Sequence, residues 1–146
     1  MKDSAAVLAS LKPFQRRTVE YVYRRMYEDA DPAMKFLIAD EVGLGKTLVA
    51  KGIIALAIEK MQRDGKIDRI DVVYVCSNAA IARQNINRLN VTGEKDYAMA
   101  SRLTLLPYHL KKLNSRKVNF VSLTPGTSLE ASKGAGTWEE SKEACS

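Results

Sequence analysis

Apolar residues in this chain gather into short segments that alternate between two patterns. Residues 34–39 form a largely apolar run typical of a strand covered on both faces. Residues 70–76 and 118–123 are further apolar runs, the first of them rich in β-branched side chains, and each ends at residues that favour turns or caps. We predict that these three segments are strands.

Three other segments have the longer period of a helix. Residues 13–28 open with a proline and carry apolar side chains on one side and mostly arginines on the other. Residues 47–61 are apolar nearly all round, so we expect this helix to lie buried against the sheet. Residues 79–89 are predicted to be a third helix, with Ser77 and Asn78 as its cap.

The remaining segments have weaker patterns. We interpret residues 97–106 as partly extended and residues 108–113 as a short helix or turn. From residue 127 onward the chain consists mainly of Ser, Gly, Lys, Glu and Ala, a composition that buries little apolar surface. We therefore expect a mobile polar tail.

The alternation of predicted helices and strands indicates an α/β fold. It favours a mostly parallel sheet with helices on both faces and ligands at the carboxyl ends of the strands. The length of 146 residues is enough for one domain with a sizeable core, and 46% of the residues are hydrophobic. We detect no internal repeat.

The net charge of +6 is unevenly distributed. Residues 126–146 carry two lysines and four glutamates, a balance of −2, so residues 1–125 carry +8. A basic body suits an anionic partner such as nucleic acid or a nucleotide. The alternative is that the positive charge serves only solubility.

The cysteines and the apolar stretches bear on the cellular compartment. Cys76 and Cys145 lie far apart and have no partner at metal-ligand spacing, which favours reduced thiols in the cytoplasm. The N-terminus lacks the apolar core of a signal peptide, and the longest apolar stretch, residues 52–58, is too short to cross a bilayer. We expect a soluble intracellular protein with no membrane partner.

The strongest chemical signal is Gly-x-Gly-Lys-Thr at residues 43–47, between a predicted strand and a predicted helix. Glycines there allow successive backbone N–H groups to turn inward around a polyphosphate. Lys46 would reach the β- and γ-phosphates, and the Thr47 hydroxyl would bind Mg²⁺. The alternative is a glycine turn with a surface lysine. The predicted ATP and Mg²⁺ site comprises Val42, Gly43, Leu44, Gly45, Lys46 and Thr47.

One position departs from the general phosphate-loop pattern, because Asp40 stands where the first glycine is expected. In this respect residues 39–47 resemble motif I of superfamily 2 helicases, above all the Swi/Snf-like translocase branch, in which an Asp-Glu pair precedes the loop. Residues 11–15, Leu-Lys-Pro-Phe-Gln, resemble the Q motif of these proteins. This resemblance implies that Gln15 selects ATP by bonding the adenine edge. The alternative is a polar residue in the first turn of a helix.

Two later segments follow in the order of the same family. Residues 75–84 are similar to motif Ia, although Asn78 stands at the proline position and Ile81 at the leucine position. Residues 120–127 resemble motif Ib of DEAD-box relatives, a strand ending in Thr-Pro-Gly; the alternative is a simple proline-glycine turn. The resemblance implies that nucleic-acid backbone contacts come from Ser77, Asn78, Arg83, Thr124 and Gly126.

Hydrolysis in this family needs a second acidic motif, an apolar strand ending in Asp-Glu. Residues 36–41 imitate that pattern, but they run directly into the phosphate loop and cannot supply both halves of the site. We therefore expect an incomplete RecA-like P-loop NTPase domain over residues 1–125, followed by the polar tail at residues 126–146. It would be the N-terminal piece of a larger ATPase, with no complete catalytic set of its own.

The resemblance thus predicts the ATP-binding part of an ATP-dependent helicase or translocase. Its cofactors would be ATP and Mg²⁺, and its partners nucleic acid, with DNA favoured over RNA, and the remaining helicase lobes. The alternatives are a non-catalytic nucleotide-binding or interaction module, and another P-loop NTPase. Tyrosines at positions 21, 23 and 27 could stack on bases, but core packing is the preferred interpretation.

Overall fold

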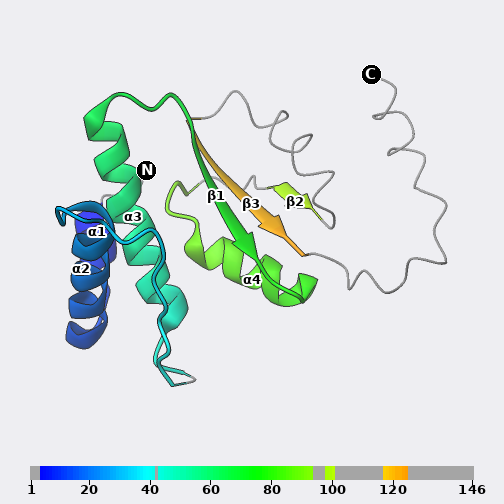
Figure 1. Ribbon diagram of the computed structural model, residues 1–146. Helices are drawn as coiled ribbons and strands as arrows, with labels where there is room; N and C mark the ends of the chain where they lie inside the picture. Colours follow the sequence, from blue (N-terminus) through cyan, green and yellow to red (C-terminus); the bar gives the residue numbers. More distant parts are fainter. Residues whose placement is uncertain (1–3, 42, 94–97, 101–116, 125–146) are drawn as a thin grey trace.

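The computed structural model describes residues 4–41, 43–93, 98–100 and 117–124 (Figure 1). The helices in these residues are α1 (Ser4–Ala9), α2 (Pro13–Tyr27), α3 (Lys46–Asp64) and α4 (Ala79–Leu89). The strands are β1 (Ile70–Val75), β2 (Ala98–Ala100) and β3 (Val118–Leu123). The predicted turn or helix at 108–113, the tail from residue 126 and Cys145 lie outside the described residues.

Helix α2 has the amphipathic pattern that its sequence predicts. Pro13 occupies its first turn, where a missing N–H group costs nothing. Val19 and Val22 are buried on the side that faces α3, and the helix ends one residue before the predicted end. The boundaries of α4 and β3 match the predicted ranges, and β1 ends one residue earlier than predicted. These predictions are confirmed.

Helix α3 lies at the centre of the helical layer, packed against α1, α2 and α4. It ends at Gly65, whose φ of 65° closes the helix in the left-handed conformation that glycine adopts readily. Ala55 and Ile58 of α3 join Ile70 and Phe120 of the sheet in one buried cluster. The predicted burial of this helix against the sheet is therefore confirmed for its C-terminal half.

The sheet is parallel throughout, with the order β1-β3-β2. Ile70 of β1 pairs with Val118 of β3, and the register continues to Val75 and Leu123. Strand β2 falls within the segment interpreted as partly extended and pairs with the second half of β3. Because parallel strands start and end together, the carboxyl ends of β1 and β3 lie at one edge of the sheet.

The helices that the structure describes pack on one face of this sheet, and helices on both faces stay a prediction. Helix α4 packs on β1 and β3 on the side of Phe120. On the opposite face of β1, Asp71, Val73 and Val75 are exposed, and Val75 retains 60% of its accessible surface. Helices α1 and α2 stack on α3.

The predicted strand at residues 34–39 is also wrong, because these residues have no strand partner among those described. Met34 is 87% exposed and Leu37 is 84% exposed. Phe36 instead packs edge-on against Tyr21 of α2, with ring centroids 5.9 Å apart. An apolar run indicates a tendency to be buried, but a strand also needs a neighbouring strand to bond its backbone, and β1 pairs with β3.

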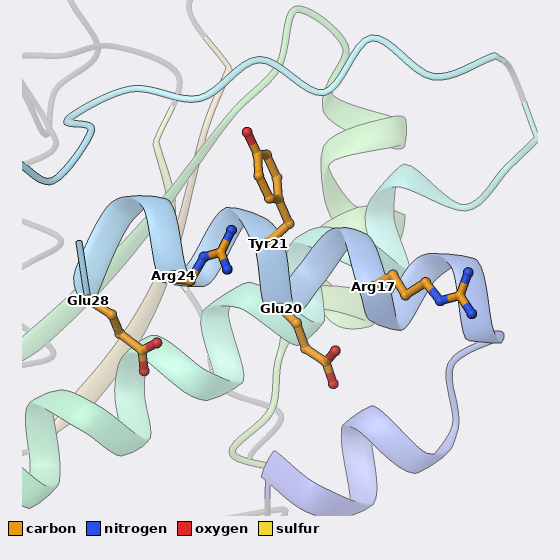
Figure 2. Close-up of a pocket in the computed structure, with 5 residues that line it drawn as sticks. All are labelled: Arg17, Glu20, Tyr21, Arg24 and Glu28. Carbon is orange, nitrogen blue, oxygen red and sulfur yellow. The ribbon is translucent and has the colours of Figure 1, made fainter.

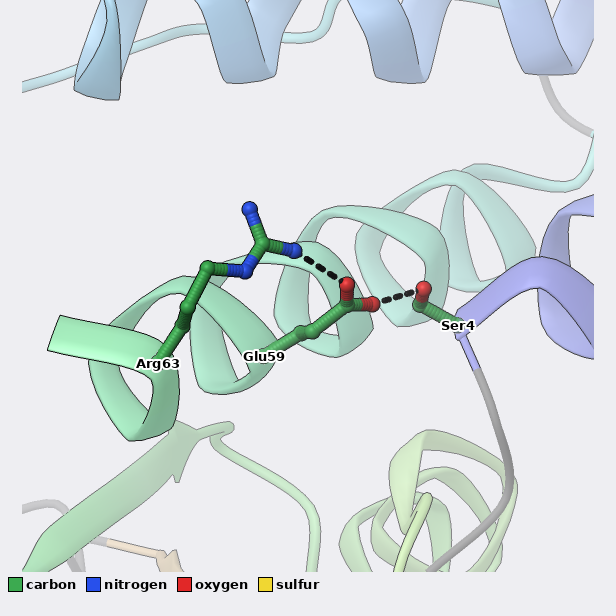
Figure 3. Close-up of polar contacts among 3 residues, drawn as sticks. All are labelled: Ser4, Glu59 and Arg63. Atoms are coloured by element: carbon green, nitrogen blue, oxygen red, sulfur yellow. Dashed lines mark hydrogen bonds and ion pairs between the residues drawn. The ribbon is translucent and has the colours of Figure 1, made fainter. Parts of the chain in front are cut away.

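Helix α1 was not predicted from the sequence. It buries Val7 in the core and is tied to α3 through Ser4, whose hydroxyl donates a hydrogen bond to Glu59 (Figure 3). The Arg63 guanidinium pairs with the other oxygen of the same carboxylate. The Ser4 hydrogen bond, followed by the Arg63 contacts, lowers the pKa of Glu59 below its ordinary value.

This arrangement predicts how stability responds to acid. Because folding lowers the pKa of Glu59, the ionised carboxylate adds to the free energy of unfolding at neutral pH. This stabilisation disappears as the pH falls below about 4.5 and the carboxylate takes up a proton. Glu59→Gln is expected to reduce the free energy of unfolding at pH 7 by less than about 1 kcal/mol, since the pair is partly exposed. Urea titrations at several pH values should show this difference shrinking in acid. An equal difference at all pH values would contradict the assignment.

Candidate nucleotide-binding site

The Gly-x-Gly-Lys-Thr segment forms a tight turn that leads directly into α3. Gly43 and Gly45 adopt φ angles of 91° and 85°, in the left-handed region that other residues rarely occupy. Helix α3 begins at Lys46, and no side chain caps it. Repeated left-handed residues of this kind turn backbone N–H groups toward a common centre and form an anion-binding nest. Val42 lies outside the described residues.

The start of α3 has backbone donors available for an anion. The N–H groups of Leu48 and Val49 both donate to the carbonyl of Gly45, at 2.8 and 3.1 Å. Lys46 and Thr47 are the first two residues of the helix, so their N–H groups have no acceptor within it. The helix dipole adds a partial positive charge at the same place. These donors suit a phosphate group.

The side chain of Lys46 folds back over the loop. Its ammonium donates to the backbone carbonyls of Asp40 at 2.8 Å and of Glu41 at 2.9 Å. Both bonds are exposed, so an anionic ligand can replace them at little energetic cost. Lys46 is thus held beside the turn that its sequence motif assigns to phosphate, bonded to carbonyl oxygens of that turn.

Gln15 bonds to the loop, although it lies 29 positions before Leu44 in the sequence. Its amide Nε2 donates to the Leu44 carbonyl at 2.9 Å, and its Oε1 accepts from the Lys12 N–H at 3.0 Å. A Cβ atom on Gly45 would stand only 2.4 Å from this Nε2. The structure therefore brings the predicted Q-motif glutamine and the phosphate loop into contact.

A cavity of about 350 Å³ opens beside Lys46 and Thr47 and runs between α3 and β1. Its other walls come from Ala50, Ile54, Val72, Val73, Tyr74 and Leu89. Most of these lining residues are apolar, and Lys46, Thr47 and Tyr74 contribute polar side-chain groups. The sequence has no signal for such a cavity, because the residues that line it come from elements that meet only in the folded chain.

These residues fit a magnesium triphosphate. The loop provides left-handed turns, and the first N–H groups of α3 have no acceptor within the helix, so both suit phosphate oxygens. Lys46 provides a positive charge, and the half-buried Thr47 provides a hydroxyl. In the described residues no three side chains of His, Cys, Asp or Glu gather as a preformed metal site. A metal ion here would depend on ligand oxygens together with Thr47.

The residues assigned to nucleic-acid contacts gather at one edge of the sheet. Ser77 and Thr124 follow the paired strand ends of β1 and β3, and the Cys76 N–H donates to the Leu123 carbonyl at 3.0 Å. The N-terminal end of α3 points toward the same edge (Figure 1). The phosphate loop and these residues therefore share one side of the molecule. Gly126 lies outside the described residues.

Asn78 caps α4, as predicted. Its side-chain oxygen accepts from the N–H groups of Ala80 at 2.9 Å and Ile81 at 3.1 Å. While this cap is in place, those two N–H groups are occupied and do not bind phosphate. Arg83 is exposed on the same helix. For nucleic-acid contact, the exposed side chains of Ser77 and Arg83 are better placed than the backbone of α4.

A second hollow of about 390 Å³ lies on the outer side of α2 and is lined by Arg17, Glu20, Tyr21, Arg24 and Glu28 (Figure 2). Its arginines and glutamates balance in charge, so it does not favour an anion. Tyr21 is 51% exposed, with the Arg24 guanidinium 5.8 Å from its ring centroid, so core packing is wrong for this tyrosine.

Tyr23 and Tyr27 fit the predicted core packing better than Tyr21 does. Their rings stack on each other with centroids 5.3 Å apart, and both side chains are partly buried. Burial raises the pKa of each phenol. These two tyrosines stabilise the C-terminal half of α2 rather than presenting their faces to a base.

Comparison with known proteins identifies no relative of this chain: no family model, curated protein or solved structure matches it.

Within the described residues, no helix combines the length and apolar character needed to cross a lipid bilayer. The Cys76 thiol is free and half-buried.

Proposed function

We propose that this chain is the ATP-binding part of an ATP-dependent nucleic-acid helicase or translocase, with an incomplete RecA-like fold. The observation that carries the proposal is the turn with left-handed Gly43 and Gly45, which places Lys46 and Thr47 in the first turn of α3. The parallel pairing of β1 and β3 supports it, since this architecture presents ligands at strand carboxyl ends.

Each residue of the loop has a distinct part in the proposed binding. The backbone N–H groups from Gly45 to Thr47 hold phosphate oxygens, and the Lys46 ammonium leaves the carbonyls of Asp40 and Glu41 to neutralise the terminal phosphates. The Thr47 hydroxyl is a ligand for Mg²⁺, which when bound screens the charge of the triphosphate.

The edge formed by the ends of β1 and β3 is the proposed path of nucleic acid. Ser77 and Thr124 follow the paired ends of these strands, Val75 and Leu123, and Arg83 adds a positive charge from α4. Such contacts to the phosphate backbone position a strand without reading its sequence. The excess positive charge of the chain supports an anionic partner of this kind.

The test is a calorimetric titration of the full chain with Mg·ATP, combined with a phosphate-release assay in the presence and absence of duplex DNA. We expect binding that saturates at or below millimolar nucleotide and very slow turnover, because no catalytic carboxylate has been assigned in this chain. Binding with no turnover under any condition would favour a non-catalytic nucleotide-binding module. A titration without any signal at millimolar Mg·ATP would contradict both.

A further inference from the structure

The side chain of Gln15 is held by backbone atoms at both ends of its amide. Only 4% of the residue is exposed. Its oxygen caps the first turn of α2 by accepting from the Lys12 N–H, and its nitrogen donates to the Leu44 carbonyl. The amide therefore has one fixed orientation, set by its own helix on one side and by the phosphate loop on the other.

The hydrogen bond from Gln15 to the Leu44 carbonyl also fixes the direction of the Gly45 N–H group. The Leu44 carbonyl and the Gly45 N–H belong to the same peptide unit, which is planar and trans, so the two groups point in opposite directions. Because Gln15 draws the carbonyl toward α2, the Gly45 N–H is directed away from α2. That N–H is one of the donors that the nest of the loop would offer to a phosphate.

Gln15 and Gly45 are packed so closely that no side chain fits at position 45. A Cβ atom at Gly45 would stand 2.4 Å from Nε2 of Gln15, closer than any ordinary contact. On its other side, the Gly45 carbonyl accepts from the N–H groups of Leu48 and Val49. Gly45 is thus held between the Gln15 amide before it and the first turn of α3 after it.

We propose that Gln15 is a positioning residue for the phosphate loop: by bonding the Leu44 carbonyl, it aims the Gly45 N–H at a bound triphosphate. This inference rests on the proposed function of the loop. It differs from the role implied by the family resemblance, in which the glutamine reads the adenine edge. A buried amide with one N–H and its oxygen already bonded to backbone presents little surface to a base.

The two roles predict different ligand dependence. A positioning residue affects every ligand that carries a triphosphate, whereas a base reader affects only adenine nucleotides. Gln15→Met keeps the length of the side chain and removes both hydrogen bonds. Native and variant chains are titrated with Mg·ATP, Mg·GTP and magnesium tripolyphosphate. We expect all three affinities to fall by about tenfold, with an unchanged ratio of ATP to GTP affinity.

A loss confined to ATP, with tripolyphosphate affinity unchanged, would overturn the inference and favour adenine reading. If the native chain binds none of the three ligands, the result would instead contradict the proposed function. The matched control is Gln84→Met, which alters an exposed glutamine of α4 and is expected to leave all three affinities unchanged.

A measurement without ligand tests the same inference directly. In ¹⁵N-labelled protein, Gln15→Met is expected to shift the amide resonance of Gly45, while the amide of Gly65, another left-handed glycine at the far end of α3, stays in place. An unmoved Gly45 resonance would contradict the positioning role. If the methionine variant fails to fold, Gln15→Glu keeps the acceptor for Lys12, loses the donor to Leu44, and is expected to shift Gly45 in the same way.

Discussion

Mg·ATP affinity is expected to fall by about 10- to 100-fold when Lys46 is replaced by alanine. Hydrogen bonds to charged groups contribute about 1.5–3 kcal/mol, and 1.4 kcal/mol corresponds to a factor of ten. Among the residues that the structure describes, the ammonium bonds the exposed backbone carbonyls of Asp40 and Glu41. Its loss should therefore change the free energy of unfolding by less than about 1 kcal/mol, so weakened binding would not reflect an unfolded chain.

The measurement is a calorimetric titration of the Lys46→Ala variant beside a matched lysine variant of the same helix. Lys60→Ala removes a lysine from the other half of α3, where it pairs with Asp64 at 3.7 Å on the surface. Lys60→Ala should bind Mg·ATP as the native chain does. Equal affinity of the Lys46→Ala and native chains would show that the loop is a simple glycine turn with a surface lysine.

Stability should respond strongly to a side chain at Gly52, where Val19 of α2 packs closely against α3. A Cβ atom there would lie 2.8 and 3.1 Å from the two Cγ atoms of Val19 and 3.3 Å from Leu11 Cδ1. Val19 is fully buried and β-branched, so it has few alternative rotamers. Overpacking costs up to about 3 kcal/mol, and the better helix propensity of leucine returns about 1 kcal/mol. Gly52→Leu should therefore lower the free energy of unfolding by up to about 2 kcal/mol.

Urea unfolding of the single and double variants measures this contact. In a Val19→Ala background the two Cγ atoms are absent, so Gly52→Leu should be less harmful there by about 1 kcal/mol or more. Additive effects of the two substitutions would contradict the close approach of the helices. Val19→Ala alone provides the control for the loss of buried apolar surface.

Several elements could be predicted from the sequence because their signals are local. Residues 79–89 and 118–123 form a helix and a strand with the predicted boundaries, and Asn78 caps the helix with its own side chain. Helical periodicity, a capping residue and β-branched runs all act over a few neighbouring residues. The predicted strands at 70–76 and 118–123 also pair in parallel, as the alternation of elements indicates.

Other predictions were wrong where the outcome depends on distant neighbours. Residues 34–39 have the apolar character of a strand, yet no strand lies beside them in the described part of the chain. Tyr21 lies on α2 like Val19 and Val22 but faces Phe36 and solvent rather than the core. Apolar composition favours burial, but whether a residue is buried depends on which element packs over it.

The sequence by itself determined the chemistry of the candidate site: two glycines, a lysine and a threonine at a spacing suited to phosphate, placed before a helix. Only the tertiary structure decided that Gln15 holds Leu44, that Lys46 bonds Asp40 and Glu41, and that a cavity separates α3 from β1. The reason is physical. Backbone angles and helix starts depend on neighbouring residues, whereas the contacts of a side chain depend on elements that meet only after the chain has folded.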